Sequence, residues 1–121
     1  MKLTIGKDDI QAVLAKYGGS NAVAGYVEEA KMLAFPLPKY YVAVIDEANL
    51  TLVQMDMKFR EKAAEVLPLS TITDVKISNM IVKKVTIKTT NTTYRILIRP
   101  LSIGIGDEQK ELLRRFESMA N

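Results

Sequence analysis

Hydrophobic and polar residues alternate over three neighbouring segments in the second half of the chain, at 73–77, 82–89 and 93–99. Apolar residues recur at every second position, at 75 and 77, at 85 and 87, and at 94, 96 and 98, with charged or hydroxyl-bearing residues at most positions between them. A period of two places the apolar side chains on one face of a β-strand and the polar side chains on the other. The pattern therefore predicts consecutive antiparallel strands with one buried and one solvated face.

Three further segments are rich in β-branched, aromatic or other apolar residues and also predict strands. Segments 40–45 and 50–55 are joined by a short polar turn and predict a hairpin. Pro68 places the short strand 66–69 at a sheet edge or a bend, because proline cannot donate a ladder hydrogen bond. We interpret 56–64, which is polar and basic, as a loop or a helical turn.

Segment 20–38 is compatible with two structures. Some of its apolar residues have helical spacing, whereas 22–27 also fits a first strand. We favour a strand followed by a loop, because Pro36 and Pro38 exclude a helix at the end of the segment. Residues 32–37 are very apolar for a loop, and they either cover a barrel opening or contact another copy of the chain.

Two amphipathic segments predict helices, at 8–17 and at 107–120. The apolar stripe of the second helix consists of Leu112, Leu113, Phe116 and Met119. A helix, about seven short strands and a closing helix predict a mainly β protein with a strongly bent antiparallel sheet or small barrel, whose open end the last helix plugs. We treat 1–121 as a single domain, with 1–20 as a helical extension of the β domain 21–121.

Composition excludes several classes of chemistry. The 121 residues include no cysteine and no histidine, so thiol nucleophiles, disulfides, zinc sites built on these residues and histidine acid–base catalysis are absent. The carboxylate pairs Asp8–Asp9 and Asp46–Glu47 are typical of helix caps and turns. We therefore expect a non-enzymatic protein with no catalytic residue, no metal and no cofactor.

The same composition bears on location. No run approaches the roughly 20 apolar residues of a spanning helix, so the sequence predicts no transmembrane segment. The lack of cysteine fits a reducing compartment. We expect a cytoplasmic protein, with peripheral attachment to a membrane as an open alternative.

Positive charge is concentrated in one part of the chain. The net charge is +3, from 17 basic and 14 acidic residues, and every charge between positions 75 and 106 is positive. A two-residue turn at 91–92 would place most of these bases on the outer face of the last strands. The candidate binding residues on this face are Lys76, Lys84, Lys88, Arg95 and Arg99.

The expected strand register brings these bases together without a carboxylate among them. It pairs Lys88 with Arg95 and Lys84 with Arg99, and it places Lys76 beside Lys84. Because like charges that lie opposite repel, the face is either a solvated surface that discourages edge pairing or a site for an acidic partner or an anionic membrane. Outward aromatics for base stacking are missing, so nucleic acid is not an expected partner.

Three short motifs follow one another along the chain: the strand–turn–strand 44–53, the Pro-Leu-Ser-x-Ile-x-x-Val pattern at 68–75 and the hairpin 85–96. Their sequences, order and spacing resemble those of the pleckstrin-homology (PH) superfold, and in particular of bacterial PH-like and GRAM-type domains. The resemblance implies seven bent strands capped by a C-terminal helix, in a protein of a bacterium or of a phage that infects one. It also implies a binding or scaffolding role.

The resemblance does not extend to the recognition of phosphoinositide lipids. The basic signature of phosphoinositide-binding PH domains is missing from the first two predicted strands. We expect the partner to be another protein or a second copy of the chain, bound through an edge strand. The alternative is a peripheral binder of an anionic membrane or an acidic partner through the basic outer face.

Overall fold

The computed structural model describes residues 5–30, 38–78 and 80–120. Seven antiparallel strands form one sheet in the order β4-β3-β2-β1-β7-β6-β5. The helices are α1 (Lys7–Tyr17) and α2 (Gly106–Met119). The strands are β1 (Val23–Glu29), β2 (Tyr40–Ile45), β3 (Asn49–Met55), β4 (Glu61–Pro68), β5 (Ile72–Ile77), β6 (Lys83–Thr89) and β7 (Thr93–Ile98), with a 3₁₀ turn, η1 (Leu69–Thr71), before β5.

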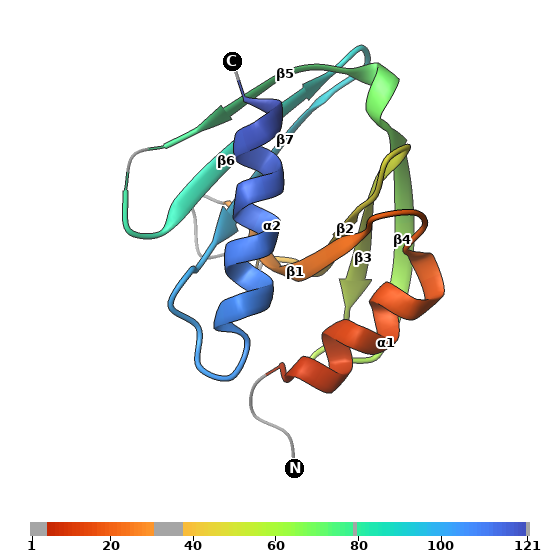
Figure 1. Cartoon of the computed structure of the whole chain (residues 1–121), viewed down its shortest axis with the longest axis vertical. Helices are drawn as coiled ribbons and strands as arrows, with labels where there is room; N and C mark the ends of the chain where they lie inside the picture. The colour runs from red at the N-terminus through yellow and green to blue at the C-terminus, as the bar shows by residue number, and fades with distance from the viewer. Residues whose placement is uncertain (1–4, 31–37, 79, 121) are drawn as a thin grey trace.

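The sheet bends sharply between β1 and β7. Within the described residues these two strands pair through Glu28 with Leu97 and Glu29 with Ile96, and the Ala30 N–H donates to the Arg95 carbonyl at 2.9 Å. Away from this short contact the halves β4–β1 and β7–β5 diverge. Figure 1 shows α2 lying in the angle between the two halves. Leu112 and Phe116 of α2 are fully buried in the core that both halves share. This arrangement confirms the predicted bent sheet closed by an amphipathic C-terminal helix.

The outer face of the first sheet half carries a second core. Ile10 and Val13 of α1 pack there against Ala24, Val42 and Val53. As a result β2 and β3 are largely buried on both faces, which explains why the sequence of β2 is a continuous apolar run rather than an alternating one. Burial of one face of α1 also explains its helical apolar spacing.

Strand β1 confirms the expectation of a strand at the start of 20–38, whereas the stretch 32–37 lies outside the described residues. The interpretation of 56–64 as loop or helical turn is wrong for 61–64, which belong to β4. Every residue of β4 except Leu67 is exposed, because β4 lies at the sheet edge and Leu67 is its one residue in either core. A strand that is exposed on both faces has no alternation for a sequence pattern to detect. Pro68 lies in an edge strand, as predicted, although this strand ends at Pro68 rather than at residue 69.

Candidate functional site

The five predicted bases lie on one outward face of the sheet half β5–β7. We call this surface the basic face. All five side chains are exposed, and none is buried by α2, which covers the opposite side. Lys76 lies on β5, Lys84 and Lys88 lie on β6, Arg95 lies on β7, and Arg99 directly follows β7.

The predicted register within this face is wrong by two residues. Lys88 lies opposite Thr93, and Lys84 lies opposite Leu97, rather than opposite the two arginines. The turn forms at 90–91 instead of 91–92, since the Thr89 N–H donates to the Thr92 carbonyl at 2.8 Å. The Thr89 hydroxyl oxygen also accepts the N–H groups of residues 91 and 92, at 3.2 and 3.0 Å, and this side-chain turn fixes the register.

The observed register separates like charges. The sequence predicted Lys76 beside Lys84, but Lys76 pairs with Thr86 instead. Thr86 in turn lies opposite Arg95. A threonine therefore stands between the two bases along this row. The spacing lowers the repulsion expected from directly opposed bases.

Two carboxylates border the basic face, contrary to the expectation that it holds none. Asp74 lies opposite Lys88 and 3.9 Å from the Lys76 ammonium. Glu28 of β1 accepts a 2.8 Å ion-paired hydrogen bond from Arg99 Nε, and this bond raises the pKa of Arg99 further above its usual value. The face therefore carries five bases against two carboxylates and stays positive.

Large apolar side chains are exposed beside the basic face. Met80 and Ile81, in the β5–β6 loop, are 68% and 79% exposed. The pairing of Lys83 with Ile98 shows that this loop and the β7–α2 loop leave the sheet at the same end, and Leu101 of the second loop is also exposed. Isolated apolar residues in loops carry no periodic signal, so the sequence pattern does not predict that these side chains are exposed together.

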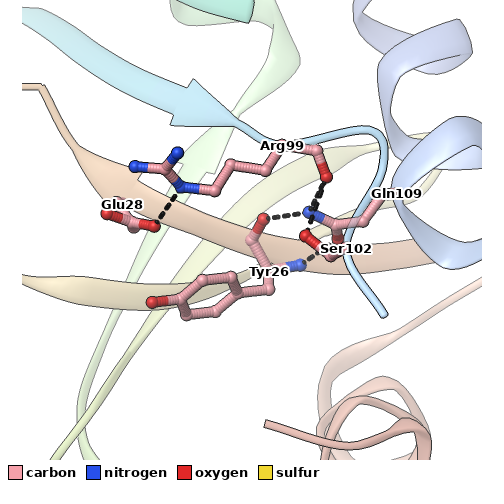
Figure 2. Close-up of polar contacts among 5 residues, drawn as sticks. All are labelled: Tyr26, Glu28, Arg99, Ser102 and Gln109. Atoms are coloured by element: carbon pink, nitrogen blue, oxygen red, sulfur yellow. Dashed lines mark hydrogen bonds and ion pairs between the residues drawn. The ribbon is translucent and has the colours of Figure 1, made fainter. Parts of the chain in front are cut away.

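A buried glutamine holds β1 against the chain that follows β7 (Figure 2). The Tyr26 N–H donates to Gln109 Oε1 at 2.6 Å, and Gln109 Nε2 donates to the Tyr26 carbonyl at 2.7 Å. The same Nε2 donates to the Arg99 carbonyl at 3.3 Å, and the Ser102 hydroxyl donates to that carbonyl at 2.9 Å. Gln109 thus replaces the backbone partner that β1 loses where β7 diverges, and it positions Arg99 beside Glu28.

A hollow of about 200 Å³ lies where the end of β1 meets β7. Glu29 and Tyr94 are among the residues that line it, and the Tyr94 hydroxyl donates to Glu65 of β4. Burial, followed by this hydrogen bond, raises the pKa of Tyr94 to about 12. Glu29 and Arg95 both line this hollow, so their opposite charges balance and the hollow attracts an anion less than the outer basic face does.

Comparison with protein-family models and with curated proteins finds no match. Among solved structures, the solution structure of the N-terminal PH domain of human ARAP2 is similar, with a TM-score of 0.50 and 14% sequence identity. The likeness covers 85% of this chain and 84% of that chain. At this identity it shows the fold alone, so the chain has the PH fold that its motifs implied. Bacterial or phage origin and the GRAM type stay predictions.

Proposed function

We propose that this PH-fold chain is a non-catalytic binding module that attaches to anionic membrane surfaces through the basic face. One combination carries the proposal: five exposed bases on one sheet face and the exposed apolar pair Met80 and Ile81 at its end. Bases are attracted to anionic head groups, and apolar side chains beside them can enter the interfacial layer. Among the residues that the structure describes, no helix is long and apolar enough to span a membrane.

The expected strength follows from the net charge of the face. Five bases less the two carboxylates Glu28 and Asp74 leave three positive charges. At the usual contribution of a base near an anionic surface, this corresponds to on the order of a hundredfold preference for anionic over neutral lipid. Salt screens such attraction, so the preference is expected to fall steeply as ionic strength rises.

Co-sedimentation with vesicles tests the proposal. We expect binding to vesicles of phosphatidylcholine with phosphatidylserine at low salt, and little binding to phosphatidylcholine alone. The double variant Lys84→Glu/Arg95→Glu is expected to abolish binding. The control Lys62→Glu/Lys110→Glu changes the net charge equally at exposed positions outside the basic face, and it should still bind. If both double variants lose vesicle binding equally, binding depends on the total charge of the protein rather than on the basic face, and the proposed site is rejected.

The apolar pair has its own test. Met80→Ser/Ile81→Ser keeps every charge, so it should weaken vesicle binding several-fold and leave its salt dependence unchanged. Circular dichroism confirms that each variant is folded. Unchanged binding by this variant would remove the loop from the proposed interface.

A second candidate, self-association through an edge strand, has one specific observation in its favour. β4 is an eight-residue strand at the sheet edge and is exposed along nearly its whole length. Such an edge can pair with a strand of another copy. Light scattering at two salt concentrations should then give a dimer mass that salt does not change and that Val66→Lys converts to a monomer. A monomer mass at high protein concentration rejects this candidate.

A further inference from the structure

A groove of about 650 Å³ opens on the outer face of the first sheet half, away from the core under α2. Its floor includes Tyr26 of β1 and Tyr40 of β2, whose rings stack with centroids 6.1 Å apart. Phe59 and the buried Ile105 add apolar wall. The volume lies within the roughly 300–1,000 Å³ of ligand pockets, which are also mainly apolar with a few polar groups.

Two highly exposed apolar side chains form opposite rims of the groove. Met57, in the β3–β4 turn, is 81% exposed, and Ile103, in the β7–α2 loop, is 97% exposed. They come from segments far apart in the sequence. Large apolar residues that protrude on both sides of an apolar hollow indicate a surface that a ligand can cover.

Phe59 is held in the groove wall by an unfavourable backbone conformation. Its φ is 60°, in the left-handed region that a bulky residue rarely adopts. The turn enforces this conformation: Asp56 Oδ1 accepts the N–H groups of Lys58 and Arg60 at 2.8 and 3.0 Å, and the Asp56 carbonyl accepts the Phe59 N–H at 3.0 Å. Strain of this kind is concentrated at functional sites.

The polar groups of the groove set the charge of its ligand. Glu28 is the charged residue among the described lining residues, and Arg99 neutralises it from outside the lining. Ser102 adds a hydroxyl. An anionic ligand would meet the Glu28 carboxylate, and a cationic one would approach the Arg99 guanidinium, so an uncharged hydrogen-bonding end fits best.

The backbone around the groove argues against a peptide. The floor is a sheet face rather than an edge, and the Tyr26 N–H and carbonyl already bond to Gln109. A polypeptide laid along this floor would bury its own main-chain polar groups without partners there. A hydrocarbon chain has no such groups along its length.

From these observations we infer that the groove binds a single hydrocarbon chain with an uncharged hydroxyl or ester end. The chain lies over Tyr26 and Tyr40 between the rims Met57 and Ile103. The polar end lies near Glu28 and Ser102. This site adjoins the basic face at Glu28, which also pairs with Arg99, but it does not depend on membrane attachment.

The test uses the full chain labelled with ¹³C at the methionine methyl groups, and 1-octanol as the probe. The Met57 methyl signal should shift saturably, while that of Met80, outside the groove lining, should not. 1-Hexanol should bind roughly tenfold more weakly, because it buries two fewer methylene groups. Octanoate should bind at least several-fold more weakly than octanol, because its carboxylate meets Glu28.

Variants locate the site. Ile103→Glu should weaken octanol binding tenfold or more, and Ile81→Glu, at a similarly exposed residue outside the groove lining, should not change it. The inference is overturned if octanol shifts both methyl groups alike, if Ile103→Glu binds as wild type, or if octanoate binds as tightly as octanol. Stronger binding by the dipeptide acetyl-Leu-Leu-amide than by octanol would also overturn it and assign the groove to a polypeptide.

Discussion

Replacing Gln109 by methionine tests how the two halves of the sheet are joined. The side chain of Gln109 is fully buried, and its amide bonds to both backbone groups of Tyr26 and to the Arg99 carbonyl. Methionine has a similar length and no branch, so it occupies the same space and removes only the amide. The Arg99 carbonyl keeps its bond from the Ser102 hydroxyl, whereas both Tyr26 groups lose this partner.

The expected cost follows from those two groups. A buried donor or acceptor left without a partner costs about 1–3 kcal/mol, so Gln109→Met should lower the free energy of unfolding by about 2–4 kcal/mol. That is a large share of the roughly 5–15 kcal/mol that stabilises a domain. The loss should be local first, at the junction of β1 with the β7–α2 loop.

Urea unfolding followed by circular dichroism measures the change, and amide hydrogen exchange locates it. The Tyr26 amide should lose protection before the amides of β2 and β3. Lys110→Met is the control on the same helix: Lys110 is exposed, so its replacement should change stability by less than about 0.5 kcal/mol. A loss of unfolding free energy below about 1 kcal/mol for Gln109→Met, or an unchanged exchange rate of the Tyr26 amide, would refute the role of Gln109 in joining β1 to the β7–α2 loop.

Three further predictions concern β1, the β2–β3 turn and the Gln109 site. Gly25→Ala should cost about 1–3 kcal/mol in thermal or urea unfolding, because its Cβ would lie 2.8 Å from Gln109 Oε1 and 2.9 Å from Leu112 Cδ2. Burial raises the pKa of Asp46, but three backbone N–H donors and Arg115 together outweigh it, so the folded pKa is lowered. The stability that Asp46 contributes is therefore fully present above the unfolded pKa, near 4, and is lost as pH falls through the folded pKa. Asp46→Asn should cost about 1 kcal/mol at pH 7 and much less at pH 3 in parallel urea titrations. Gln109→Glu buries a carboxyl beside two carbonyls, which raises its folded pKa, so its stability deficit against wild type should grow from pH 4 to pH 7.

Patterns of alternation predicted the buried face of the sheet well. Val85, Ile87, Ile96 and Ile98 all point into the core, and so do Leu112 and Phe116 of the closing helix. One rule places all of these residues: apolar side chains must share a buried face. A shift of strand register by one residue would expose the apolar side chains of that strand. The PH fold and the strands, apart from the first half of β4, were therefore accessible from the sequence.

The contacts that shape the candidate sites were not accessible in the same way. The turn at 90–91 depends on one threonine hydroxyl, and a shift of two residues keeps every side chain on its predicted face. The alternation of apolar and polar positions could therefore not reveal the two-residue error in register. The partner of Arg99 is Glu28, 71 positions away, and Gln109 looks like any polar residue on a helix. Such pairs are fixed by how the two sheet halves meet, which no local pattern records.

The most direct test of the proposed membrane attachment is to observe which surface faces the lipid. Nanodiscs that contain phosphatidylserine and a spin-labelled head group broaden the NMR signals of amides close to the bilayer. The account predicts broadening in the β5–β6 loop around Met80 and Ile81 and along β6 and β7 near Lys84 and Arg95, with α1 and β4 unaffected. Broadening centred on α1 or β4, or none at low salt, would contradict it.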